Sequence, residues 1–212
     1  MSRPTRRAAG FAVTYLVICS SWTATAEGRQ EGERPVALVR VDNLAGIPAG
    51  NVRIAEERAA GIFLLIGATI RWIDQDEAVR AHVTAPFTIV LANAEKHPVG
   101  ASVFVDALGV AYPSVHRAQV FYDRVADLNV GTPRTIPSLL GDVIAHELGH
   151  LLLPPPGHSP GGIMRAELET KSWELRTFTS PQAREVLARL RGLRLIGLDP
   201  ASGQWSSPSR LR

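Results

Sequence analysis

The sequence predicts a single α+β domain built on a twisted, mixed β-sheet. The chain has 212 residues, of which 45% are hydrophobic and 20% charged, so it can bury a sizeable core. Its segments follow the order strand, helix, several strands, helix and helix, which is typical of an α+β domain. The only long apolar run lies at the extreme N-terminus, which excludes a multi-span membrane protein.

Residues 1–26 have the pattern of an export signal. Three arginines precede a short apolar segment over residues 8–19, and Ala24-Thr25-Ala26 matches a small-residue cleavage site. We therefore expect a mature chain that starts near Glu27 and is exported, either secreted or periplasmic. The alternative, an uncleaved membrane anchor, is disfavoured because the apolar segment is short for a full span.

The charge balance changes once this segment is removed. The whole chain carries 23 basic and 20 acidic residues, but three of the basic residues and none of the acidic ones lie in the first 26. The remainder is neutral, which argues against a nucleic-acid partner. The single cysteine, Cys19, is lost with the signal, so disulfides and thiolate sites are excluded. Bulky Ile18 before it disfavours a lipid anchor.

The folded domain is expected to span residues 36–195, after a flexible leader over residues 27–35 and before a loose tail over residues 196–212. Short runs rich in β-branched and aromatic residues predict the strands. These strands cover residues 36–41, 70–73, 87–91, 102–105 and 118–122. Between residues 109 and 116, Pro113 favours an edge segment or a loop.

Three helices are predicted. Apolar residues from Ala55 to Ile66 recur at helical spacing and indicate an amphipathic helix that faces the core. A turn-rich stretch over residues 129–137 precedes a second helix of about four turns. The last helix follows Thr179-Ser180-Pro181, where a capping residue and a first-turn proline stand in their usual order.

The second helix carries the motif His146-Glu147-Leu148-Gly149-His150. Histidines four residues apart lie on one face of a helix, where two imidazoles can bind one Zn²⁺. Glu147 lies beside them and can take a proton from a metal-bound water. Apolar neighbours predict that this helix is largely buried, and buried histidines need partners, which a metal supplies. The motif therefore predicts one catalytic zinc ion and a hydrolytic reaction.

A catalytic zinc needs a third protein ligand and one open position. The first candidate is His158, because the run Pro154-Pro155-Pro156-Gly157 ends the helix and can turn the chain back toward the metal. The second candidate is Glu169, further along the chain. Both remain open at this stage, with His158 favoured.

The motif, followed by His158-Ser159 and Gly162-Ile163-Met164, resembles the metzincin clan of zinc peptidases, especially its matrixin-like members. The resemblance implies a zincin-like fold with a long active-site helix and a C-terminal helix. It implies His146, His150 and His158 as zinc ligands, Glu147 as general base and Met164 in a turn under the metal. The third histidine arrives two residues later than in the clan, and Leu153 replaces a glycine.

Taken together, these features predict an exported zinc-dependent endopeptidase that acts on peptides or proteins. An extended substrate would pair with an edge strand, for which the segment 101–112 is the candidate. One alternative is a zinc peptidase that uses Glu169 as its third ligand. Another is a secreted, non-catalytic protein that binds zinc or peptides.

The remaining polar and aromatic residues carry weaker signals. Isolated histidines are expected to be surface residues: His82, His97 and His116. Asp142, one turn before His146, is read as a helix-surface acid in preference to an outer partner of the zinc ligands. Three aromatic residues belong either to the core or to a substrate pocket: Trp72, Trp173 and Phe178.

Overall fold

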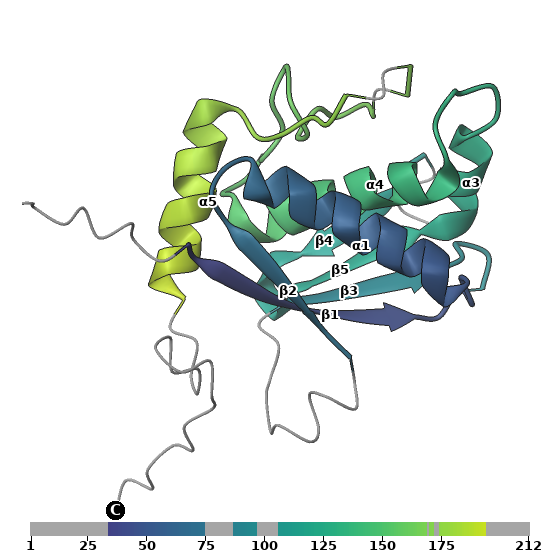
Figure 1. Ribbon diagram of the computed structural model, residues 1–212, viewed down its shortest axis with the longest axis horizontal. Helices are drawn as coiled ribbons and strands as arrows, with labels where there is room; N and C mark the ends of the chain where they lie inside the picture. Colours follow the sequence, from purple (N-terminus) through teal and green to yellow (C-terminus); the bar gives the residue numbers. More distant parts are fainter. Residues whose placement is uncertain (1–33, 75–86, 97–105, 169, 172–173, 194–212) are drawn as a thin grey trace, which may run out of the picture. The chain divides into compact units, whose positions relative to one another are not determined.

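Five strands form one mixed sheet in the order β2-β1-β3-β5-β4 (Figure 1). The computed structural model describes residues 34–74, 87–96, 106–168, 170–171 and 174–193. The expected export signal, the predicted strand 102–105 and the expected tail lie outside the described residues. The mixed α+β architecture predicted from the sequence is confirmed.

The strands lie close to their predicted positions. They are β1 (Val36–Asn43), β2 (Thr69–Ile73), β3 (Phe87–Ala92), β4 (Gly109–Tyr112) and β5 (Arg117–Phe121). The first three and β5 are parallel, whereas β4 pairs antiparallel with β5 at one edge. Central β3 reads as a continuous apolar run because both of its faces are covered. The region around Pro113 thus forms an edge strand followed by a short 3-10 helix, η1 (Pro113–Val115).

Four α-helices are described: α1 (Ala49–Leu64), α3 (Tyr122–Leu128), α4 (Ile136–Leu152) and α5 (Ser180–Gly192). Helix α1 begins six residues earlier than its apolar spacing indicated, directly after Pro48. Helix α3 was not predicted, because its seven residues are too few to show a helical period. It begins at Tyr122, which the sequence had assigned to the preceding strand.

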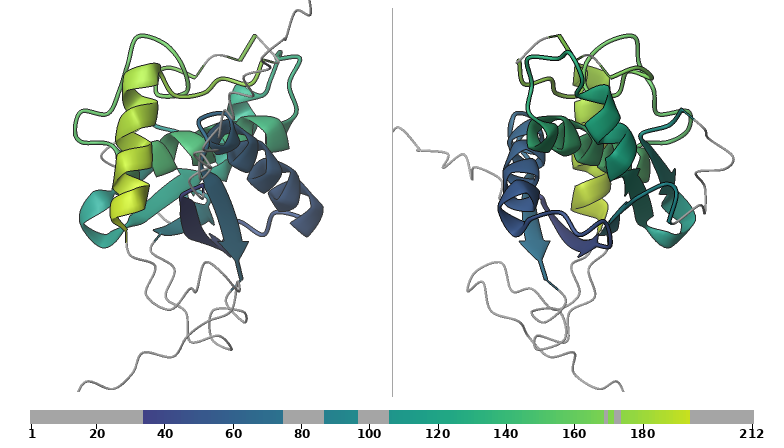
Figure 2. Two further views of the ribbon diagram at one scale, coloured as in Figure 1. Left: turned by 60° about the vertical axis from the view of Figure 1, so that its left-hand side comes forward. Right: turned by 90° about the vertical axis from the view of Figure 1, so that its right-hand side faces the viewer.

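Helices α1 and α4 lie side by side on one face of the sheet (Figures 1 and 2). Helix α1 buries Ala55, Ala59, Ile62 and Phe63. The two helix backbones approach closely at Gly141, where an added Cβ would stand 2.6 Å from the carbonyl oxygen of Ala55. Of the 17 residues of α4, 13 are buried, so this helix is covered on nearly all sides and forms part of the core.

Asp142 is not the helix-surface acid that was expected. Its side chain is 1% exposed and lies between two guanidinium groups. Arg58 of α1 donates through Nε to Asp142 Oδ1 at 2.6 Å, and Arg134 Nη2 lies 2.7 Å from Oδ2. The sequence could not reveal this pairing, because Arg58 is 84 residues away along the chain. The spacing on α4 shows only that Asp142 lies on the same helix face as His146.

Replacing Asp142 by Asn should destabilise the protein by roughly 3–5 kcal/mol, since it leaves two arginines without their anionic partner, one of them buried. The exposed pair Arg53–Glu57 on α1 provides the control. Replacing Glu57 by Gln should cost less than about 1 kcal/mol. Urea denaturation of the metal-free variants measures both free energies of unfolding. Equal, small losses in the two variants would contradict a structural role for Asp142.

Candidate metal centre

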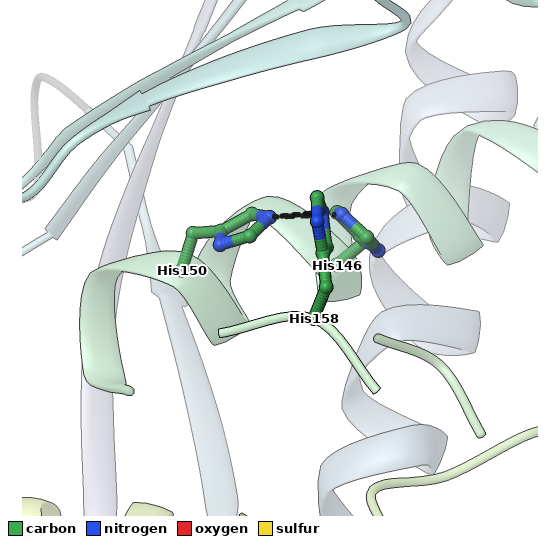
Figure 3. A group of neighbouring side chains, drawn as sticks. All are labelled: His146, His150 and His158. Atoms are coloured by element: carbon green, nitrogen blue, oxygen red, sulfur yellow. Dashed lines mark hydrogen bonds between the residues drawn. The ribbon is translucent and has the colours of Figure 1, made fainter. Parts of the chain in front are cut away.

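Three histidines converge at one point of the structure (Figure 3). His146 and His150 lie one turn apart on α4, and His158 lies on the loop that follows this helix. His150 Nε2 is 3.0 Å from His146 Nε2 and 3.1 Å from His158 Nε2. Among the residues that the structure describes, these form the one cluster of histidine and acidic side chains close enough to share a metal ion.

The two distances from His150 Nε2 fit a tetrahedral zinc site. Zn–N bonds of 2.0–2.1 Å place two ligand nitrogens roughly 3.3–3.4 Å apart, only slightly further than the observed 3.0 and 3.1 Å. His146 Nδ1 lies 2.9 Å from the carbonyl oxygen of Ile163. Since a carbonyl only accepts hydrogen bonds, Nδ1 holds the proton and Nε2 presents its lone pair to the cluster.

The surroundings also favour the neutral imidazoles that bind metals. Burial lowers the pKa of His146, against the opposing effect of the Ile163 carbonyl, and proximity to His158 lowers it further. Burial, together with His146 and His158, lowers the pKa of His150 to about 4. Because a metal ion binds the unprotonated ring, protons compete weakly for His150 above about pH 4, and they compete less for His146 than for an ordinary histidine.

The loop after α4 returns His158 to the helix. Helix α4 ends at Leu152, since the three prolines that follow cannot continue it. Gly157 then has a φ of +73° and packs against the ring of His150, where an added Cβ would lie 2.8 Å from Nδ1. The close turn at this glycine brings His158 to the cluster despite the two additional residues in the spacing.

Met164 lies under α4 and is fully buried. It contacts Gly149, the residue before His150, with Phe178 beside it. Its carbonyl oxygen accepts a hydrogen bond from the backbone amide of Ser159 at 2.9 Å, which ties this turn to the residue after His158. Phe178, left open between core and pocket, belongs to the core, where its ring packs edge-on against Phe63.

Among the residues that the structure describes, Glu147 is the one buried acid that lies next to the three histidines. Its side chain packs on Gly109 of β4, where an added Cβ would lie 2.7 Å from Oε1. The residue is 5% exposed, and burial raises the pKa of its carboxyl to about 8. The carboxyl therefore lies in a dry environment where it holds a proton more tightly than an ordinary glutamate.

A cavity of about 710 Å³ opens beside the cluster. Glu147 and the three histidines line it together with edge strand β4, which supplies Gly109, Val110 and Ala111. The further lining is mostly apolar, with Leu128, Val143, Leu153 and Leu168, and it includes three charged residues: Asp106, Arg165 and Glu167. The described part of the predicted edge segment 101–112 thus runs along the cavity.

The other candidates that the structure describes do not join the cluster. His116 lies next to the ring of Phe87, with ring centroids 5.6 Å apart. Trp72 is partly buried against the core. Four candidates lie outside the described residues: His82, His97, Glu169 and Trp173. Two residues that sequence reasoning overlooked are Gly109, for which no motif gives a signal, and Gln182, whose spacing from Thr179 indicates only a helix start.

Comparison with known proteins finds a similar solved structure but no matching family. No protein-family model matches the chain, and no curated protein matches it. Among solved structures, the chain is similar to a zinc-dependent peptidase from Methanocorpusculum labreanum, with 15% sequence identity and a TM-score of 0.46 over 70% of this chain and 99% of that one. This similarity is too low to assign an activity. Within the described residues, no helix is long and apolar enough to cross a membrane.

Zinc affinity should depend on His158 and not on His116. Replacing His158 by Asn removes one of three ligands and should weaken zinc binding by more than the roughly 10–100-fold that loss of an outer hydrogen-bond partner costs. Replacing His116 by Asn is the matched control and should leave the affinity unchanged. Competition with a chelator of known affinity measures both. Loss of zinc binding in a Glu169→Ala variant, with His158→Asn unaffected, would instead support the glutamate-liganded alternative.

In the metal-free protein, the contribution of Glu147 to stability should become less favourable as pH rises. Its pKa is about 8 when folded and near the ordinary 4.5 when unfolded, so the folded chain holds a proton between these values that the unfolded chain has released. The stability that Glu147 contributes therefore falls as pH rises from 4.5 through 8. Replacing Glu147 by Gln removes this dependence. Thermal denaturation in the presence of a chelator measures the melting temperatures of the variant and the wild type. The melting temperature of the variant relative to the wild type should be higher at pH 8.5 than at pH 5. The same difference at both pH values would contradict a buried, proton-binding Glu147.

Proposed function

We propose that this chain is a zinc-dependent endopeptidase with His146, His150 and His158 as zinc ligands. The observation that carries the proposal is the meeting of three imidazole nitrogens and the buried carboxyl of Glu147 at one cavity. A structural zinc site has four protein ligands and no use for a general base. Here three histidines face a cavity, and an acid lies beside them, as a hydrolytic site requires.

Glu147 has the properties of a general acid and base. Zinc, when bound, supplies Lewis-acid activation of a water molecule and of the scissile carbonyl. The carboxylate of Glu147 accepts the proton of the attacking water and then gives it to the leaving amine. Burial raises the pKa of the carboxyl to about 8 in the metal-free protein, and the positive charge of bound zinc would lower this pKa and favour the carboxylate that accepts the proton. Gly109 leaves space for the carboxyl at the cavity wall.

The substrate is proposed to be an extended peptide or protein segment. Strand β4 ends the described sheet on one side, pairs antiparallel with β5 and lines the cavity. Such an edge can pair with a peptide through backbone hydrogen bonds, while side chains enter neighbouring pockets. Pairing along a strand lets the peptide continue past the site in both directions, which supports cleavage within a chain. The apolar lining favours an apolar substrate side chain near the scissile bond.

Export completes the proposal. It rests on the pattern of residues 1–26, with its arginines, short apolar segment and small-residue cleavage site. The enzyme would then act outside the cytoplasm. Fractionation of cells that produce the protein, followed by mass spectrometry of its N-terminus, tests this part separately.

The decisive test of the activity is cleavage of a mixed peptide library, read by mass spectrometry with and without added zinc. The wild type should cleave in a zinc-dependent manner. Replacing Glu147 by Gln should lower kcat by about 100-fold or more, because general acid–base catalysis contributes at least that factor. The variant should still bind zinc, since it keeps the three histidines.

The same experiment separates the alternatives. Zinc bound one to one without cleavage by either protein would favour the non-catalytic binding protein. Cleavage that persists in Glu147→Gln, or that needs no zinc, would contradict the proposed mechanism. The exposed acid Glu57 supplies a control variant, Glu57→Gln, which should cleave like the wild type.

A further inference from the structure

We propose that Gln182 of α5 is a positioning residue that holds His158 in the geometry needed for zinc. The inference rests on the proposed function in one respect, namely that zinc occupies the three histidines. It adds a residue from a helix that the zinc motif does not include.

His158 is the ligand that needs support. His146 and His150 are fixed on a buried helix, and one of them is oriented by the Ile163 carbonyl. His158 is exposed and lies on a loop that begins with three prolines. Fixing a loop residue in one conformation costs conformational entropy, whereas a residue in a buried helix has already lost this entropy when the protein folds. Contacts to the loop backbone therefore decide how well the third ligand is placed.

Gln182 makes such a contact with the residue just before His158. Its Nε2 donates a hydrogen bond to the carbonyl oxygen of Gly157 at 2.9 Å. The hydroxyl of Ser159, just after His158, lies 3.3 Å from Gln182 Oε1. Both neighbours of the third ligand are thus in contact with one side-chain amide. Gly157 is also packed against His150, so this hydrogen bond acts on the turn that joins two ligands.

The orientation of the Gln182 amide is itself fixed. Its Oε1 accepts hydrogen bonds from the backbone amide of Thr179 at 3.2 Å and from the Thr179 hydroxyl at 3.0 Å. Thr179 is the N-cap of α5, and Gln182 is the third residue of the helix, as in a capping box. Because the oxygen faces the cap, the nitrogen faces Gly157. One side chain therefore starts a helix and holds the ligand loop.

The variant Gln182→Glu separates these two roles. A glutamate at this position keeps an oxygen for Thr179 and remains a standard capping residue, which a helix N-terminus also favours electrostatically. It has no donor for Gly157, and its second oxygen would face the carbonyl. We expect the zinc Kd to rise roughly 10–100-fold, as for other losses of an outer-shell partner. The melting temperature of the metal-free protein should stay within error of the wild type.

The negative charge that Gln182→Glu adds cannot by itself weaken zinc binding. An added negative charge near the site attracts a cation, so weaker zinc binding has to come from lost positioning. Arg184 is exposed and lies two residues after Gln182 on α5. Arg184→Gln is the matched control, because it changes the net charge by the same amount as Gln182→Glu. It should leave zinc affinity unchanged.

Coupling to His158 completes the test. Zinc affinity is measured by chelator competition for wild type, Gln182→Glu, His158→Asn and the double variant. If Gln182 acts through His158, its substitution should have no further effect once His158 is gone. Wild-type affinity in Gln182→Glu, or additive losses in the double variant, would overturn the inference and leave the proposed function standing. A wild type that binds no zinc would overturn both.

Discussion

The burial of helix α4 is the constraint on which the site depends. The helix lies against α1 and the sheet, and it meets α1 so closely at Gly141 that no side chain fits there. This packing fixes the face that carries His146 and His150. It also removes Glu147 from water, which raises the pKa of its carboxyl to about 8. Burial of this carboxyl destabilises the metal-free fold at high pH, whereas the positive charge of bound zinc would favour the carboxylate that the proposed mechanism needs.

The proposed third ligand is held by different means. His158 follows the helix on a loop, and the backbone of this loop is contacted from three directions. The Met164 carbonyl accepts a hydrogen bond from the Ser159 amide, the ring of His150 packs against Gly157, and the side-chain amide of Gln182 on α5 donates to the Gly157 carbonyl. A rigid helix and a supported loop together leave one side of the cluster open to the cavity. This asymmetry is what a catalytic, as opposed to a structural, metal site requires.

Most of the fold could be predicted from local patterns. The strands, the buried helix and the Thr179 cap all have periodicities or turn residues that act within a few positions. Helix α3 was not predicted because seven residues are too few to show a helical period. The start of α1 was predicted too late because the helix begins directly after Pro48 and not at the first residue of the apolar spacing. Asp142 was misjudged for another reason: its partners lie on α1 and before α4, and only tertiary packing brings them together.

The residues of the site likewise divide into those that a local motif predicts and those that only tertiary packing brings together. His146, Glu147 and His150 follow from one helical motif, and His158 was the favoured of two candidates for the third ligand, whereas Gly109 and Gln182 have no signal that links them to the motif. X-ray absorption of the zinc-loaded protein tests the central claim most directly. The account predicts three imidazole nitrogens and one light ligand that a hydroxamate inhibitor replaces. Four protein ligands that the inhibitor leaves unchanged, or fewer than three imidazoles, would contradict it.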